Sequence, residues 1–184
     1  FLIGEWEYRN NGTFILGTAE GGKKILLAGV NYLDTHLKSG ANAVNHYYLK
    51  TIHHEFTHIL NQTVTIPNEY RYITDSGYVE DLWSESPNDT GYLQRGFISA
   101  YAQNSYTEDF AEMLSIYITN SPETWNELMQ EAGEGKAAIE NKLSVVRTYL
   151  KTGFNIDIEQ LRSALQRRQN EVFTGKVDLT DLTL

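Results

Sequence analysis

One segment of the chain, residues 42–62, restricts its fold more than any other. Its sequence is NAVNHYYLKTIHHEFTHILNQ. Apolar residues recur there at spacings of three and four, which predicts an amphipathic helix with an apolar face of Val44, Tyr48, Ile52, Phe56, Ile59 and Leu60. A β-branched run and Pro67 follow, so we expect the helix to end near Gln62. The rest of the chain must cover that apolar face.

The same helix carries the pattern H-E-x-x-H at His54, Glu55 and His58. Residues four apart project from one face of a helix, so the two imidazoles can bind one ion at about 2 Å. Glu55 is offset by one residue and can hold a water beside that ion as a general base. His53 lies five residues before His58, and we expect it to point elsewhere.

A catalytic zinc site needs a third protein ligand and an open position. Asn61 and Val64 stand where the metzincin extension has Gly and a third His, so that arrangement is excluded. His46 is too far along the helix from His54 to share the ion, and we expect His36 in a surface loop. The chain has no cysteine, so His and carboxylate groups must hold any metal.

The segment TEDFAEM supplies carboxylates on a second predicted helix. Glu108 and Glu112 are four apart and share one face, so one can bind the metal while the other accepts the N–H of a ligating His. A solvated acidic helix N-terminus is the alternative, because the helix dipole favours negative charge there. With H-E-x-x-H in the same chain we favour the ligand interpretation, and the pattern leaves open which Glu is the ligand.

The elements around these motifs indicate the fold class. Residues 13–18 and 24–30 are β-rich and flank AEGG, which predicts a hairpin. Residues 63–104 show no clear period. Further helices are expected over 106–119, from Ser121-Pro122 to Gly133, from about Lys136 to Lys151 with Gly153 at the end, and from Asp157 to about Val172. This order predicts an α+β fold, with a small N-terminal sheet and a helical C-terminal half.

Length and charge limit the other possibilities. The 184 residues suit one domain over residues 1–184. A formal net charge of −9 argues against a nucleic-acid surface, and no run of 18 apolar residues could span a membrane. Because the chain begins at Phe1 rather than Met, we expect that a signal or lipid-anchor segment was removed upstream. Nothing in the sequence specifies an oligomeric state.

HEFTH followed by EDFAE resembles the zincin metallopeptidases of the gluzincin type, whose third ligand is a Glu on a later helix. The E-x-x-x-E arrangement is similar to that of anthrax lethal factor. The closer resemblance is to the "putative zinc-binding metallopeptidases" of gut Bacteroidetes, often predicted lipoproteins, in which H-E-F-x-H-x-x-x-Q precedes D-F-A-E. Here those motifs are His54–Gln62 and Asp109–Glu112, and the resemblance covers about residues 13–120.

The resemblance implies a zincin-like fold whose small sheet packs on the H-E-x-x-H helix. It also implies a Zn²⁺ cofactor, Glu55 as general base, Glu108 as third ligand and Glu112 as the partner of a ligating His. No N-E-x-x-S-D run of the thermolysin type is present, so the register between Glu108 and Glu112 stays open. An extracytoplasmic location is implied too: secreted, periplasmic or on the cell surface, where a lipid anchor could hold the protein.

Two further features follow from the resemblance. An edge strand above the metal-binding helix would bind extended substrate by strand addition, and Ile25–Gly29 is our candidate. A Tyr or His often supports the oxyanion in such enzymes. Tyr101 and Tyr106 are near Glu108 in the sequence and are candidates, although each could be an ordinary packed Tyr.

Together these observations predict a zinc-dependent endopeptidase, a hydrolase that acts on peptides or proteins. His54, His58 and Glu108 would hold Zn²⁺, and Glu55 would activate a zinc-bound water. The alternative is a metal-bound but catalytically idle binding or adhesion module at the cell surface, because H-E-x-x-H shows capacity and not turnover. A helical protein with a chance motif is the third and least favoured interpretation.

Overall fold

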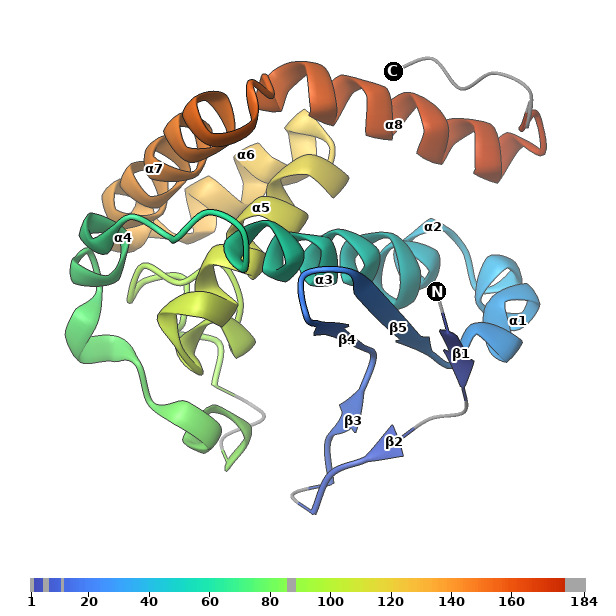
Figure 1. Cartoon of the computed structure of the whole chain (residues 1–184), viewed down its shortest axis with the longest axis horizontal. Coiled ribbons are helices and arrows are strands. Elements are labelled where there is room, and N and C mark those ends of the chain that lie inside the picture. The colour runs from blue at the N-terminus through green and yellow to red at the C-terminus, as the bar shows by residue number, and fades with distance from the viewer. Residues whose placement is uncertain (1, 5–6, 11, 86–88, 178–184) are drawn as a thin grey trace.

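The computed structural model of the chain describes residues 2–4, 7–10, 12–85 and 89–177. Its strands are β1 (Leu2–Gly4), β2 (Glu7–Tyr8), β3 (Phe14–Ile15), β4 (Gly17–Glu20) and β5 (Lys24–Ala28). Its helices are α1 (Leu33–Lys38), α2 (Ala41–Val44), the π-helical η2 (Asn45–Leu49), α3 (Lys50–Asn61), α4 (Asn68–Tyr72), α5 (Tyr106–Thr119), α6 (Pro122–Glu131), α7 (Lys136–Phe154) and α8 (Ile158–Thr174). The strands precede most of the helices, which is the predicted α+β arrangement (Figure 1).

The main sheet has the strand order β1-β5-β4. β5 pairs in parallel with β1 and antiparallel with β4, and the β4–β5 turn contains Gly21 and Gly22, both with positive φ. The predicted hairpin is therefore present. The prediction that Ile25–Gly29 forms the edge strand is wrong, because strands on both sides of β5 take up its hydrogen-bonding groups. The edge strand beside α3 is β4.

The predicted helix over residues 42–62 is present as α2, η2 and α3 in one continuous run. Its buried face differs from the predicted one, because Phe56 is 46% exposed while His54, Glu55 and Thr57 are buried. α3 packs against the sheet on one side and against α5 on the other (Figure 1). The polar residues of the motif thus occupy helix positions that would otherwise belong to the core.

His36 does not lie in a surface loop as we predicted from the sequence. It belongs to α1, its Nδ1 atom lies 2.7 Å from the hydroxyl of Tyr48, and its ring stacks on that of Tyr47. The Tyr48 hydroxyl also donates to the carbonyl of Gly29 at 3.0 Å. His36 therefore helps to join α1 to the π-helical segment, away from the H-E-x-x-H motif.

The helical half follows the sequence closely. α5 spans the predicted residues 106–119, and Ser121 and Asp157 cap the N-termini of α6 and α8 with their side chains. α7 runs on through the predicted stop at Gly153, because Asn155 takes the left-handed conformation that ends the helix. α5 is buried from Asp109 to Thr119 and contacts α3, α7 and α8, so it is the central helix of the core. No described helix is long and apolar enough to cross a membrane.

Candidate metal centre

Three potential ligands converge where α3 packs on α5. His54 and His58 are one turn apart on α3, and Glu108 lies in the first turn of α5. The Nε2 atoms of the two imidazoles are 3.1 Å apart. The Oε2 atom of Glu108 lies 3.0 Å from Nε2 of His54 and 3.2 Å from Nε2 of His58. Within the described part of the chain, these three side chains form a group that could hold a metal ion.

The spacing of these three atoms fits a tetrahedral zinc site. Ligand atoms about 2.0–2.1 Å from a tetrahedral ion stand about 3.3 Å from one another. The observed separations of 3.0, 3.1 and 3.2 Å are within a few tenths of that value. Two imidazoles and one carboxylate also match the donor set of catalytic zinc sites.

The N-terminus of α5 determines where Glu108 lies. Ser105 caps the helix, and its hydroxyl accepts the backbone N–H of Glu108 at 3.3 Å. The sequence S-x-x-E at this point would also suit a capping box, in which the Glu side chain turns back to the Ser N–H. The Glu108 carboxylate instead lies against the two imidazoles of α3.

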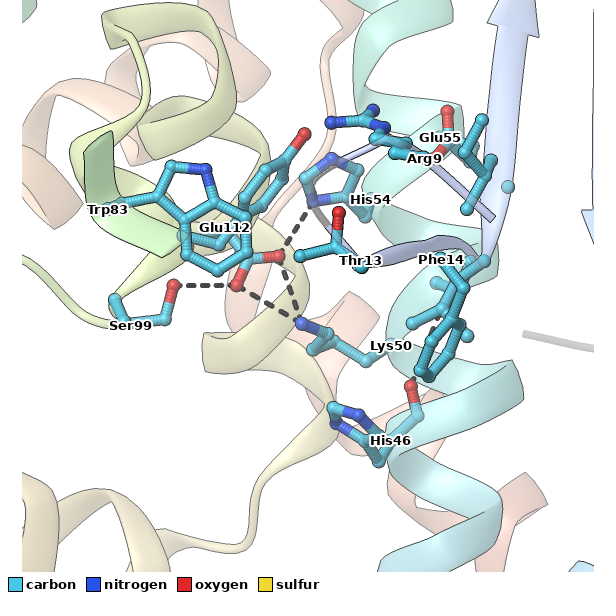
Figure 2. Close-up of a pocket in the computed structure, with 17 residues that line it drawn as sticks. Arg9, Thr13, Phe14, His46, Lys50, His54, Glu55, Trp83, Ser99 and Glu112 are labelled. Carbon is cyan, nitrogen blue, oxygen red and sulfur yellow. Dashed lines mark hydrogen bonds and ion pairs between the residues drawn. The ribbon is translucent and has the colours of Figure 1, made fainter. Parts of the chain in front are cut away.

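Glu112, one turn further along α5, fixes the orientation of His54. Its Oε1 atom lies 2.8 Å from Nδ1 of His54, a distance that suits donation of the Nδ1 proton to the carboxylate. That tautomer leaves a lone pair on Nε2, aimed at His58 and Glu108. Lys50 donates to both oxygens of Glu112 at 3.0 and 3.1 Å, and the Ser99 hydroxyl donates to Oε2 at 2.7 Å (Figure 2). The buried Glu112 carboxylate is thus fully hydrogen-bonded.

The electrostatics of the group favour a cation. Burial acts to lower the pKa of His54, but hydrogen bonds to Glu108 and Glu112 outweigh it and raise this pKa to about 9. Burial acts to raise the pKa values of both carboxyls. The imidazoles at Glu108, and the Lys50 ammonium followed by His54 at Glu112, hold these two pKa values well below the usual range. Two ionised carboxylates around one imidazole provide a strong local preference for positive charge.

Glu55 is buried on α3 beside this group, and burial is the main cause that raises its pKa. The start of β4 passes directly over it. A Cβ added to Gly17 would lie 2.8 Å from Cγ of Glu55 and 3.0 Å from Cγ2 of Thr51. Only glycine fits this approach, so the edge strand of the sheet lies against the general-base candidate.

A cavity of about 530 Å³ adjoins the metal centre. His54, Glu55 and Glu112 line it, whereas His58 and Glu108 do not, so the three candidate ligands lie at its margin. Figure 2 shows Arg9, Thr13 and Phe14 on one side of the cavity and Trp83 and Ser99 on the other. His46, from the π-helical segment, lines its far end.

The structure brings one of the two tyrosine candidates to this cavity. Tyr101 lines it, and the Tyr101 ring centroid is 5.9 Å from that of His54. Burial, followed by the charge of Glu108, raises the pKa of Tyr101 well above its usual value, so its hydroxyl remains a hydrogen-bond donor. Tyr106 does not line the cavity. It is 37% exposed and lies under the guanidinium of Arg71, 5.8 Å from its ring centroid.

His53 points away from the metal centre, as its register predicts. It lines a second, small cavity with Leu165 and Arg168 of α8, and burial lowers its pKa to about 4. The sequence interpretation missed Lys50 and Ser99. Lys50 could have been found, because it stands four residues before His54 on the same helix face. Ser99 has no such signal, since it comes from the irregular segment before α5.

A two-His, one-Glu group beside a cavity, with a further Glu next to it, is the arrangement of a zinc-binding metallopeptidase. Residues 1–159 match a family model described as "Putative zinc-binding metallo-peptidase". The chain belongs to this family, which confirms the resemblance seen in its two motifs.

One solved structure supports this assignment. It is the crystal structure of a "putative zinc-binding metallo-peptidase" from Bacteroides caccae, which is 35% identical to this chain with a TM-score of 0.76. The match covers 95% of this chain and 65% of the Bacteroides caccae chain, so our chain spans less than two thirds of that relative's length. No curated protein matches the chain significantly.

Proposed function

We propose that this protein is a zinc-dependent endopeptidase with a zincin-like catalytic domain. The convergence of Nε2 of His54, Nε2 of His58 and Oε2 of Glu108 at 3.0–3.2 Å carries the proposal. The family description as zinc-binding and the neighbouring cavity support it. These three side chains would hold the zinc ion.

Bound zinc would supply Lewis-acid polarisation of the scissile carbonyl and lower the pKa of an attacking water. Side chains of the protein would supply proton transfer, orientation of the ligands and stabilisation of the oxyanion. Glu55 accepts the proton of that water and returns it to the leaving amine, a role that its burial and raised pKa suit. Glu112 holds the ring of His54, and Lys50 and Ser99 hold Glu112. The Tyr101 hydroxyl donates a hydrogen bond to the oxyanion that develops on the substrate.

The edge strand β4 would bind the substrate backbone. β4 has β5 as its single strand neighbour in the described part of the sheet, so its outer edge is available for strand addition. Gly17 lies over Glu55, so a peptide paired with β4 would run past the general base. We also propose that the protein works outside the cytoplasm, secreted or held by a lipid anchor, as the motif resemblance implies. Fractionation of the source cells tests this location.

Cleavage of a peptide library tests the proposed activity. Zinc-loaded parent protein near neutral pH should cleave some members, and Glu55→Gln should lower turnover at least about 100-fold while zinc content is unchanged. Glu69→Gln is the matched control, because it removes an exposed carboxylate on α4 that lies outside the cavity. A Glu55→Gln variant as fast as the parent would refute the mechanism. A zinc-loaded parent that cleaves no peptide or protein would favour the idle binding module.

A further inference from the structure

Two walls from different parts of the chain form the cavity beside the candidate metal centre. One is formed by the β2–β3 hairpin and the start of β4, and it contributes Arg9 and residues 12–17. The other is formed by Trp83 and residues 99–101 (Figure 2). Phe14, Ile15, Leu16, Trp83 and Ala100 make much of the lining apolar. A volume of about 530 Å³ lies within the range of ligand-binding pockets.

Two ionisable groups that line the cavity, Glu55 and Arg9, have no ion-pair partner among the described residues, whereas the others are paired or neutral. The ammonium of Lys50 pairs with both oxygens of Glu112. Burial and the neighbouring Lys50 lower the pKa of His46, which therefore stays neutral. The guanidinium of Arg9 has neither an ion pair nor a side-chain hydrogen bond with any described residue. The exposed Arg9 thus gives the largely apolar cavity a cation that has no ion-pair partner among the described residues.

The hairpin backbone holds Arg9 in this position. The N–H of Arg9 donates to the carbonyl of Thr13 at 2.7 Å, and its carbonyl accepts the N–H of Gly12 at 3.0 Å. Gly12 has φ +82°, which a turn this tight requires. Arg9 lines the same cavity as Glu55 and His54, and its charge acts on the hydroxyl of Tyr101 in that cavity (Figure 2).

Trp83 also lines the cavity, but its Nε1–H is not open to it. That N–H is buried without an acceptor in the described part of the chain. The accessible cation of the cavity is therefore the guanidinium of Arg9, which favours a ligand group with negatively charged acceptor oxygens.

We propose that Arg9 is a specificity-determining residue, and that its guanidinium binds a carboxylate of the peptide substrate next to the scissile bond. The apolar walls of the cavity, which include the Trp83 ring, take up the stem of the substrate residue. The carboxylate can belong to an Asp or Glu side chain or to a free C-terminus, because both present the same oxygens to the guanidinium. The inference rests on the proposed peptidase function, since it assigns the substrate class of that site.

Peptide binding to the zinc-loaded Glu55→Gln variant separates recognition from turnover. The probes are fluorescein-labelled octapeptide pools with Glu, Gln or Lys fixed at each central position, each pool with a free or an amidated C-terminus. One carboxylate-bearing set should bind about 5- to 10-fold more tightly than its neutral counterpart by fluorescence anisotropy. A preference for Glu over Gln identifies the side chain, and a preference for free over amidated ends identifies the C-terminus.

Variants of Arg9 in the same Glu55→Gln background decide the assignment. Arg9→Gln should abolish the preference, and Arg9→Glu should reverse it in favour of the Lys pools. Arg71→Gln is the matched control, because Arg71 is exposed and lies outside the cavity, and it should leave the preference unchanged. Absence of a preference, a preference that survives Arg9→Gln, or failure of all pools to bind would overturn the inference. Arg9-dependent binding by a protein whose parent form cleaves no peptide would instead refute the proposed catalysis alone.

Discussion

Two carboxylates of α5, three residues apart, pair with lysines of different helices, and the two pairs have different environments. Asp109 lies 2.6 Å from Nζ of Lys142, and both side chains are 0% exposed. Glu112 lies 3.0 Å from Nζ of Lys50, with side-chain exposures of 2% and 19%. The first pair faces α7 in the core, and the second faces α3 and lines the cavity. The same chemistry therefore serves two purposes along one helix.

The Asp109 pair is closed off within the core. Lys142 also donates to the carbonyl of Gly96 at 2.8 Å and lies 4.0 Å from the ring centroid of Phe97, and Tyr78 donates to Asp109 at 2.9 Å. Burial raises the pKa of Asp109 to about 6 and lowers the pKa of Lys142. Such a pair costs desolvation energy, and neither residue lines the cavity beside the candidate metal centre, so we assign it the role of holding α5 in place.

The Glu112 pair, in contrast, also contacts the group of potential metal ligands. One of its three donors is the imidazole of His54, whose other nitrogen faces His58 and Glu108. The Glu112 pair therefore orients a candidate ligand, whereas the Asp109 pair lies within the core. The comparison teaches that a buried ion pair indicates function when one of its partners also contacts a cavity or a group of potential ligands.

The largest expected effect comes from the closed pair. Lys142→Met leaves Asp109 buried without its cation and should lower the free energy of unfolding by about 3–5 kcal/mol, measured by urea denaturation. The loss should shrink as the pH falls from 7 towards 5. Burial raises the folded-state pKa of Asp109 above its unfolded value, so protonation there favours the folded variant. Lys136→Met, which breaks an exposed pair with Glu140, should change the free energy by at most about 0.5 kcal/mol. Equal losses for Lys142→Met and Lys136→Met would contradict the distinction between the buried pair and an exposed pair.

Measurements of zinc affinity test the role of the Glu112 pair. Glu108→Gln removes a ligand and should weaken zinc binding more than about 100-fold, whereas Glu112→Gln removes an orienting partner and should weaken it about 10- to 100-fold. Asp109→Asn should destabilise the fold but leave the zinc affinity of folded protein within about threefold. Competition with a chromophoric chelator measures all three. If Glu112→Gln had the larger effect than Glu108→Gln, the two Glu residues would have exchanged roles.

The smallest expected effect on the free energy of unfolding comes from replacing Lys50, the lysine of the Glu112 pair. Lys50→Met leaves Glu112 with hydrogen bonds from His54 and Ser99, and the adjoining cavity can admit water. We expect a loss of about 1–2 kcal/mol in the free energy of unfolding, smaller than that for Lys142→Met. Thermal and urea unfolding of the two variants side by side checks the ranking. A loss as large as that of Lys142→Met would mean that the Glu112 pair is equally structural.

Local sequence signals predicted much of the helical half and the His54–His58 pair, and the family resemblance added Glu108 to this candidate metal centre. α6 and α8 begin at caps that are visible in the sequence, Ser121 and Asp157, and the i, i+4 spacing of His54 and His58 follows from helix geometry. Where local signals compete, prediction failed. Helix α7 passes Gly153 because the left-handed position is taken by Asn155, two residues later.

Features that depend on tertiary pairing were beyond the sequence. β5 is the central strand because it also pairs with β1, a short segment outside the predicted hairpin. The close approach of Gly17 to Glu55 joins segments that are far apart in the chain, and the hydrogen bond from Ser99 to Glu112 starts in a segment without a periodic pattern. The cavity itself lies between the β2–β3 hairpin and the irregular segment before α5, neither of which has a periodic pattern. No local rule relates such positions to one another.

The central claim is that His54, His58 and Glu108 hold a zinc ion. Anomalous diffraction from crystals of zinc-loaded protein, collected on both sides of the zinc absorption edge, tests it most directly. We expect one strong peak about 2.0–2.2 Å from Nε2 of each imidazole and from a carboxylate oxygen of Glu108, with Glu112 hydrogen-bonded to Nδ1 of His54. A peak coordinated by Glu112 in place of Glu108, or no peak at these three residues in zinc-loaded crystals, would contradict it.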